Sequence, residues 1–577
     1  MTKAQKTLTI HSNAQTGFHL IGDGALGGKA DGLTALSSLL SQHPDWRTAY
    51  PDVQIGIPET LVITTHLFEA FLEQNGLEAM AGQGASDADI VARFLKSRLP
   101  DGLQAVLDNY LTYTTEPLAV RSSGLLEDAR LHAYAGLYRT YMLSNDQADK
   151  SQRLAHLAQA IKLIYASTYF EGPRAYARRV GHRIEDDRMA VLIQHVAGLR
   201  YGDHYFPTFS GVADSLNYYP MPGMKSEDGT VAIAIGLGRQ VVSGERALRF
   251  SPKHPRRLVQ RSSVEEMLAY GQRHLYALQM GTQSLVGAED RDNLVQLNIA
   301  DVENQLPMHL LAGTYVQNEH RVRETISIPG PRVVNFSGIL KHNLFPLADL
   351  LQHILTAAEA FMHSAVELEF AVNIAPSSRQ ASQFYLLQLR PMAARRIGTD
   401  VTIEPEEPRK AICYTEHAMG NVDQLAIRDI VFVKPEAFDT AHTRDIAGQL
   451  AKINQQLVQR NRTYLLVGPG RWGSADPWLG IPVRWSDISG VAAIVETTSE
   501  NLKADPSLGA HFFHNLAALG ISYLCVTGRA PDHFNWSWVT TQKIVRQESF
   551  VAHVRPDQPV VVKVDGRTSR GVIKGND

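Results

Sequence analysis

Short apolar runs, which are typical of buried strands, alternate with longer helix-period segments along the whole 577-residue chain. The strand-like runs include residues 60–64, 118–121, 189–195 and 231–235, and the helical segments include 152–169 and 347–365. A short apolar run bounded by turn residues indicates a strand, whereas a period of 3.6 residues indicates a helix. The alternation predicts an α/β architecture, or its α+β variant.

The chain is too long for one hydrophobic core, so we expect several structural units. Residues 398–408 contain three glutamates and two prolines and follow a predicted strand that ends near Leu389, which is typical of a linker. We therefore place a first region at residues 1–397, a linker at 398–410 and a smaller α/β region at 411–577. In the last region we predict a helix at 512–519 and strands at 429–433, 464–467, 492–496, 522–526 and 560–564.

Composition excludes several classes of protein. The formal net charge of −3 shows no basic footprint for nucleic acid, and 44% hydrophobic residues argue against disorder. Only Cys413 and Cys525 occur, too few for a disulfide framework or a cysteine-based zinc site. The polar residues 1–13 do not resemble a signal peptide, and the apolar runs are shorter than a membrane span. We expect a cytoplasmic protein with neither a nucleic-acid nor a membrane partner.

A glycine-rich turn follows the predicted strand at 18–21 and precedes a helical stretch that reaches residue 40. Residues 22–27 satisfy the dinucleotide pattern GxGxxG, but that pattern alone is weak. A Walker A loop does not fit, because Asp23 replaces its first glycine and Ala30 its Ser or Thr. What remains is Lys29, which a flexible turn would present to a phosphate. The alternative is a solvated lysine after a turn.

A second cluster ends the predicted strand at 118–121. Arg121, Ser122 and Ser123 place a planar guanidinium and two small hydroxyl donors together, a set that suits phosphate oxygens. The alternative is that Arg121 pairs with Glu127 or Asp128, which follow closely.

A third cluster lies on two further strands. Glu367 and Glu369 share one face of the first strand, and Gln388 and Arg390 share one face of the second. Carboxylate and amide oxygens are ligands that Mg²⁺ accepts beside nucleotide phosphates. The pattern predicts a magnesium and phosphate site between the two strands.

In this order, the three clusters resemble the nucleotide-binding ATP-grasp domain of phosphoenolpyruvate synthase, pyruvate phosphate dikinase and their water-dikinase and rifampin-phosphotransferase relatives. The resemblance runs from about residue 22 to residue 392. The segments that carry it are 27–30 (GGKA), 57–65 (IPETLVITT), 119–123 (AVRSS), 189–194 (MAVLIQ), 236–238 (GLG) and 387–391 (LQLRP).

The resemblance implies an ATP-grasp region over residues 1–397, with two subdomains that split near 185–200. It also implies a role for each matching residue. We expect Lys29 and Arg121 on the phosphates, Gln194, His195 and Val196 along the adenine, Glu369 and Gln388 with Glu367 on magnesium, and Arg390 near the transferred phosphoryl group.

The same family carries a swivelling domain with a phosphate-accepting histidine, and residues 411–577 resemble a diverged version of it. The segment 491–496 is similar to the strand before that histidine, and His511 has the family's spacing to residues 519–521 (LGI). At a helix N-terminus, His511 would face free N–H groups that favour a phosphoryl group, and neutral imidazole is a competent nucleophile. The alternative is that His511 caps the helix or joins a polar network with His514.

The sequence departs from the family pattern at several positions. Arg239 replaces the usual glutamate after 236–238, Ala133 and Tyr134 replace a serine and a phenylalanine, and Gly509 with Ala510 replaces Thr-Ser before His511. Nucleotide binding should survive these changes more readily than catalysis.

The turn at residues 468–473 (GPGRWG) would present Arg471 and Trp472, a pair suited to an anion beside a flat apolar group. We predict an acceptor-binding insertion there. The alternative is a structural turn with a half-buried Trp472.

The leading hypothesis is an ATP- and Mg²⁺-dependent phosphotransferase of the dikinase type, with His511, Arg121 and Arg390 as catalytic residues and an unidentified small-molecule or protein acceptor. No phosphoenolpyruvate barrel is recognisable, so pyruvate is not expected as acceptor unless a partner chain supplies that barrel. Two alternatives stay open: a non-catalytic ATP-binding regulatory protein, and an ATP-grasp ligase that forms an acyl phosphate. A homodimer is compatible with the sequence.

Overall fold

The fold is described from a computed structural model. It describes residues 8–13, 18–78, 80, 84–127, 134–220, 223–258, 263–281, 293–377, 379–392, 401–499, 502 and 510–575. Predictions that concern Asp128, Ala133, Gly509 and residues 393–400 lie outside these residues.

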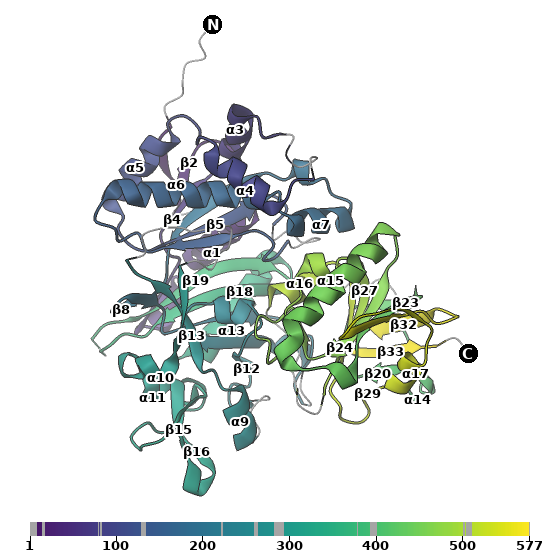
Figure 1. The fold of residues 1–577 in the computed structure, drawn as a ribbon. Coiled ribbons are helices and arrows are strands. Elements are labelled where there is room, and N and C mark those ends of the chain that lie inside the picture. The colour runs from purple at the N-terminus through teal and green to yellow at the C-terminus, as the bar shows by residue number, and fades with distance from the viewer. Residues whose placement is uncertain are drawn as a thin grey trace.

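The N-terminal part is built on a six-stranded sheet whose order is β1-β2-β4-β7-β5-β6. Its strands are β1 (Ile10–Asn13), β2 (Phe18–Ile21), β4 (Thr60–Ile63), β5 (Leu118–Gly124), β6 (Thr140–Leu143) and β7 (Met189–His195). The helices that share a hydrophobic core with it are α3 (Thr65–Asn75), α4 (Asp87–Lys96), α5 (Leu103–Tyr113), α6 (Lys150–Ser167) and α7 (Glu171–Val180). In Figure 1, α5 and α6 lie above this sheet and α1 (Gly28–Gln42) lies below it.

Both faces of the central strands β4, β5 and β7 are buried, which explains their unbroken apolar runs. On β4, Leu61 and Ile63 join the core under α3 and α6, whereas Val62 points the other way and packs with Leu33 of α1. Strand residues alternate between faces, so one short run supplies two cores.

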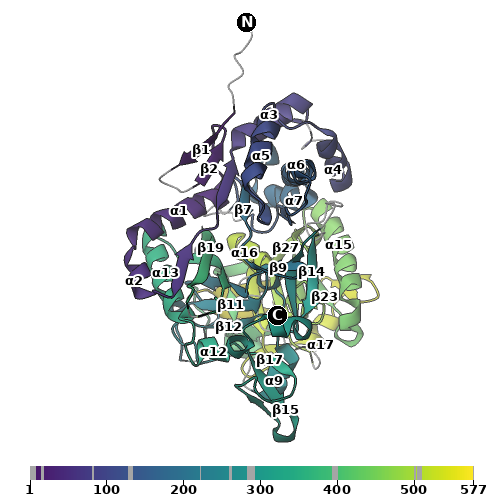
Figure 2. The same ribbon diagram turned by 90° about the vertical axis from the view of Figure 1, so that its left-hand side faces the viewer.

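A second six-stranded sheet has the order β12-β11-β10-β18-β19-β3. Its strands are β3 (Val53–Gly56), β10 (Phe209–Asp214), β11 (Thr230–Ile235), β12 (Leu248–Phe250), β18 (Val366–Asn373) and β19 (Ser382–Pro391). Helix α1 lies between the two six-stranded sheets, beside β19 and α13 (Leu347–Met362), as Figure 2 shows. Gly32 allows this contact, because a Cβ there would lie 2.1 Å from the Leu389 carbonyl oxygen.

Smaller sheets extend this part. The order β14-β13-β9-β8 joins β8 (Leu199–Tyr201), β9 (His204–Phe206), β13 (His274–Gln279) and β14 (Leu294–Asn298), and β15 (Ala312–Val316) pairs with β16 (Arg321–Arg323) and β17 (Arg332–Val334). The chain leaves the first sheet after His195, within the predicted split at 185–200. The division is not purely sequential, because β3 comes early in the chain and pairs with β19.

The C-terminal part packs two sheets against each other. A seven-stranded sheet has the parallel strands β23 (Asp429–Val433), β24 (Tyr464–Pro469), β27 (Val491–Thr497) and β28 (Ser522–Val526) at its centre, flanked by β21 (Ala418–Met419), β31 (Val551–Val554) and β30 (Ile544–Gln547). The five-stranded partner contains β22 (Val422–Ile427), β32 (Val560–Asp565), β33 (Arg570–Lys574), β20 (Cys413–Thr415) and β29 (His533–Phe534). Two helices contact the larger sheet: α15 (Thr443–Gln459) contacts β31, and α16 (His511–Ala518) contacts β28.

The expectation of an α/β, α+β multidomain architecture is confirmed, and the strands at 189–195, 429–433 and 522–526 have the predicted bounds. The last four residues of the predicted linker form the short helix α14 (Glu407–Lys410). Lys563 Nζ of β32 donates a hydrogen bond to Glu407 Oε2 at 3.2 Å, so α14 is bound to the five-stranded sheet of the C-terminal part.

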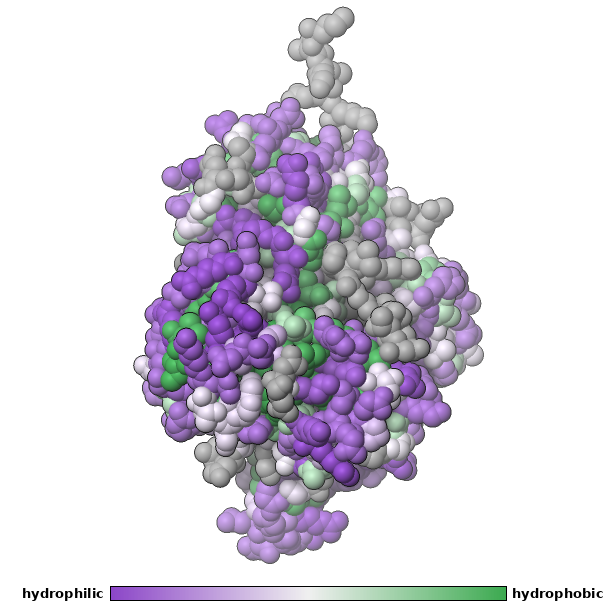
Figure 3. Space-filling model, turned by 90° about the vertical axis from the view of Figure 1, so that its right-hand side faces the viewer, coloured by the Kyte–Doolittle hydropathy of each residue, from purple (hydrophilic) through white to green (hydrophobic). Residues whose placement is uncertain are grey.

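The surface of the described residues shows two general features. Among the described residues, no helix is both long and apolar enough to cross a membrane. The described residues on the face shown in Figure 3 are mainly hydrophilic, and the hydrophobic areas there are small and separate.

Candidate active site

A cavity of about 470 Å³ lies where the two six-stranded sheets meet the C-terminal part. It is lined by most of the residues that the sequence singled out: Lys29, Arg121, Gln194, His195, Val196, Glu369, Gln388, Arg390 and His511. Three of the predicted residues, Glu367, Arg471 and Trp472, do not line it.

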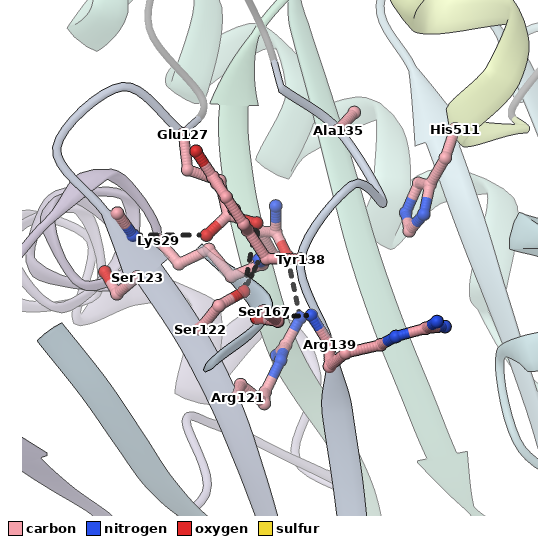
Figure 4. A network of polar contacts seen from close by, with 12 residues as sticks. Lys29, Arg121, Ser122, Ser123, Glu127, Ala135, Tyr138, Arg139, Ser167 and His511 are labelled. Carbon is pink, nitrogen blue, oxygen red and sulfur yellow. Dashed lines mark hydrogen bonds and ion pairs between the residues drawn. The ribbon is translucent and has the colours of Figure 1, made fainter. Parts of the chain in front are cut away.

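Lys29 enters the cavity from the first turn of α1. Gly27 just before it has φ +77°, and a Cβ there would lie 1.8 Å from the Ser123 carbonyl oxygen, so glycine is required. The Lys29 ammonium group contacts the Glu127 carboxylate and donates to Ser122 Oγ at 3.1 Å (Figure 4). Only 12% of the Lys29 side chain is exposed, so the alternative of a solvated lysine is wrong.

Arg121 connects the predicted clusters with one another. From β5 its Nη2 donates to Gln388 Oε1 at 2.7 Å and lies 3.5 Å from Glu369 Oε2, and its Nη1 donates to Gln194 Oε1 at 3.3 Å. Glu127, a partner proposed as the alternative, binds Lys29 instead. The guanidinium group therefore faces the cavity floor that β7, β18 and β19 form.

Glu369 is a partly buried carboxylate, with 14% of its side chain exposed, and it lies among cationic side chains. Burial alone would raise its pKa, but a hydrogen bond with His511 and the positive charge of Arg121 hold the pKa at about 2. Its Oε1 lies 3.5 Å from His511 Nε2. Glu369 is therefore ionised at neutral pH and can balance positive charge within the cavity.

A second cluster of buried polar side chains surrounds Glu367. Arg390 lines the cavity and forms an ion pair with Glu367, and both side chains are 3% exposed. Glu367 pairs in register with Asp214 of β10, and burial together with the Glu367 charge raises the pKa of Asp214 well above its usual value. Burial also raises the pKa of Glu367, and it lowers the pKa of His514, whose Nδ1 lies 3.7 Å from Glu367.

Two corrections to the predicted site follow. Glu367 engages Arg390 outside the cavity lining, so it is not placed to bind a metal ion there. Trp472 is completely buried and its indole Nε1 donates to the Val495 carbonyl oxygen at 3.5 Å, so the turn does not present it to a ligand. Arg471 is also buried and donates to the Gly244 carbonyl oxygen at 3.1 Å. The turn is a structural one, as its alternative proposed, but Trp472 is fully buried rather than half-buried because it fills the core.

His511 comes from the C-terminal part and is the first residue of α16. Its ring lies beside Gly136 of the N-terminal part, where an added Cβ would be 2.4 Å from Nδ1. Four residues later Asn515 accepts from the Ala135 amide at 2.9 Å and donates to the Ala135 carbonyl at 2.7 Å. His511 does not cap α16 with its side chain, because Ala510 is the N-cap residue. Figure 4 shows His511 beside Ala135 and across the cavity from Lys29.

Some lining residues were not predicted. Asn515 stands four positions after His511, so both project from one face of α16, and this spacing could have indicated a shared role. Arg239 also lines the cavity, and its guanidinium lies 5.8 Å from the centre of the Tyr276 ring. The cation that replaces the family's usual glutamate is thus placed against an aromatic face.

Comparison with known families decides the relationship. Residues 24–410 match the family described as pyruvate phosphate dikinase, AMP/ATP-binding domain. The chain belongs to this family. The match contains every cavity-lining residue predicted for the nucleotide, from Lys29 to Arg390, and it ends before His511. A search of curated proteins gave no match.

Membership confirms the recognised resemblance and places most of the cavity lining in an AMP/ATP-binding domain. It also supports phosphotransferase-type activity at the level of the family. Among the described residues, no group of three or more His, Cys, Asp or Glu side chains could hold a metal ion by itself.

Proposed function

We propose that the protein is an ATP-dependent phosphotransferase in which His511 accepts a phosphoryl group from ATP and passes it to an acceptor. The observation that carries the proposal is the position of His511, which lines the same cavity as Lys29, Arg121 and Arg390 although it lies outside the matched domain. In this proposal residues 1–397 form the nucleotide-binding region, and 411–577 form the carrier region.

The transfer step follows from the groups in the cavity. A lone pair of the neutral His511 imidazole forms a bond to phosphorus, the bond from phosphorus to the bridging oxygen breaks, and its electron pair leaves on the nucleotide. The positive charge that develops on the imidazole faces the ionised Glu369 carboxylate. Lys29, Arg121 and Arg390 offset the negative charge of the phosphates.

The donor set fits a magnesium ion that is bound mainly through ATP. Glu369 and Gln388 present one carboxylate and one amide oxygen at paired positions of β18 and β19. Mg²⁺ in nucleotide sites commonly takes one or two protein ligands and completes its shell with phosphate oxygens and water. It would supply further neutralisation of phosphate charge.

The first test uses ATP labelled separately at the β and γ phosphates, with Mg²⁺ and the purified chain. We expect acid-labile label on the protein, release of AMP if the mechanism is of the dikinase type, and loss of label in His511→Asn while ATP still binds. His442→Asn is the matched control, because His442 is an exposed histidine of the same region, paired with Asp445. Label that persists in His511→Asn would refute the carrier role.

A second candidate is an ATP-binding regulatory protein without turnover. Arg239 favours it, since a cation occupies a cavity position where the family usually has a glutamate. ATP binding with neither label nor hydrolysis in the wild type would support that function. An ATP-grasp ligase is separated by His511→Asn, because a ligase that forms an acyl phosphate keeps its activity without the histidine.

A further inference from the structure

The segment 468–478, here named the docking turn, is held rigidly at the end of β24. Its strand β25 (Arg471–Trp472) pairs with β26 (Gly480–Ile481), and the buried Trp472 anchors it in the core. Gly470 and Gly473 have φ of +72° and +77°, so the backbone makes two sharp changes of direction that glycine permits.

One side of the docking turn donates hydrogen bonds to the loop at residues 243–246 of the nucleotide-binding part. Arg471 Nη1 and Ser474 Oγ both donate to the Gly244 carbonyl oxygen, at 3.1 and 3.0 Å, and the Ala475 amide donates to the Ser243 carbonyl at 3.0 Å. This loop follows α8 (Arg239–Val242), and residues of α8 line the cavity.

An ion pair completes this contact. Arg246 Nε lies 3.4 Å from Asp476 Oδ2, and the two side chains are 21% and 16% exposed. Partial burial makes such a pair more sensitive to charge reversal than an ion pair in open solvent. The contact therefore joins the C-terminal part to the wall of the nucleotide cavity through three hydrogen bonds and one ion pair.

The other side of the docking turn touches the helix that carries His511. A Cβ on Gly473 would lie 2.4 Å from Cγ of Phe512, the residue next to His511. Gly473 and Phe512 both line the cavity. The turn is thus in direct contact with the first turn of α16 and with the cavity wall at the same time.

We propose that the docking turn positions His511, by fixing the start of α16 relative to the loop at residues 243–246 beside the nucleotide. The inference rests on the proposed function, in which His511 receives the phosphoryl group. Arg471, Ser474 and Asp476 are positioning residues, since they act through α16 and touch neither nucleotide nor reacting atoms. A turn needed only for the stability of the C-terminal part would not aim two side-chain donors at a carbonyl of the other part.

A charge swap across the contact tests this role. Arg246→Asp and Asp476→Arg each place like charges together, whereas the double variant restores an ion pair in the opposite sense. Because a displacement of about 1 Å can cost a rate factor of about one hundred, we expect each single variant to slow labelling of His511 by about tenfold or more. We expect the double variant to recover most of that rate, and the dissociation constant of ATP to stay within about twofold.

A second measurement reports position without phosphoryl transfer. Spin labels on cysteines placed at Tyr113 and Ile544, which are 83% and 54% exposed, report the distance between the two parts by pulsed electron resonance. Native Cys413 and Cys525 are buried. Glu548→Arg, which breaks an ion pair with Arg546 inside the C-terminal part, is the matched control.

The outcomes separate the two proposals. Broadened distances and slow labelling in the single variants, both restored in the double variant, support the docking turn. Wild-type distances and labelling rates in the single variants overturn it. If the distances respond to the swap but even the wild type takes no label, the positioning role stands and the proposed carrier function fails.

Discussion

Gly136→Ala should separate nucleotide binding from phosphoryl transfer. A Cβ at this position would lie 2.4 Å from His511 Nδ1, whereas ordinary contact begins at 3.4 Å, so the imidazole and the new methyl group must separate by about 1 Å. A displacement of that size at a reacting group costs a factor of about 10² in rate, which corresponds to about 2.7 kcal/mol of barrier. We expect labelling from ATP to slow by about that factor.

Two matched glycines control this experiment. Gly136 and Gly181 have φ of +64° and +73°, but Gly181 faces open space, so Gly181→Ala measures the backbone strain of about 1–2 kcal/mol alone. Gly172 lines the same cavity with nothing near its Cβ, so Gly172→Ala measures a methyl group added to the cavity wall. Rapid-mixing label transfer gives the rate, and calorimetry gives the dissociation constant of ATP. A Gly136→Ala protein that is labelled at the wild-type rate would refute the placement of His511 in the transfer step.

Three further variants probe the charges around the cavity. Lys29→Met should weaken ATP binding by about 10- to 100-fold in calorimetry, the usual contribution of hydrogen bonds to charged groups. It also leaves the Glu127 carboxylate without its cation, so adding Glu127→Gln should restore the free energy of unfolding but not the affinity for ATP. Arg390→Met leaves Glu367 buried without its cation and should cost about 3–5 kcal/mol of stability. Burial raises the pKa of Glu367 and the Arg390 charge opposes that rise, so without Arg390 the pKa should rise further. The folded variant then binds more protons relative to its unfolded chain than the wild type does, and the loss of stability should shrink in denaturation measured as pH falls from about 7 to about 5. Glu369→Gln should raise the Mg²⁺ concentration needed for labelling, and since the pKa of Glu369 is about 2, wild-type labelling should show no acid limb from this group above about pH 4. An unchanged magnesium requirement in Glu369→Gln would remove Glu369 from the metal site.

Much of the fold was predictable because its central strands are buried on both faces. Such strands are continuous apolar runs, and the strands at 189–195 and 429–433 therefore have the predicted bounds. The linker was harder. Glutamates and prolines indicate exposed chain, but composition does not reveal that Glu407 would meet Lys563 and Lys574 on the neighbouring sheet.

The candidate site was predictable as separate clusters rather than as one arrangement. Lys29 and Arg121 each carried a recognisable local pattern, and the family resemblance ordered them. The pairing of Glu127 with Lys29, and of Asn515 with the backbone of Ala135, joins residues far apart in the sequence. Local patterns hold no information on such pairs.

The docking turn shows why an aromatic residue in a turn is ambiguous. Glycines and an arginine around Trp472 favoured a ligand-binding surface, and the same residues also suit a turn whose tryptophan fills a core. The burial of Trp472 against Gly468 of β24 and Val495 of β27 decides between these interpretations.

Mapping the labelled residue shows whether ATP phosphorylates His511. The chain is incubated with Mg²⁺ and labelled ATP, digested under alkaline conditions that preserve phosphohistidine, and its peptides are separated by mass. We expect acid-labile phosphate on the peptide that contains His511. Phosphate on another residue, or no phosphate on a chain that demonstrably binds ATP, would contradict it.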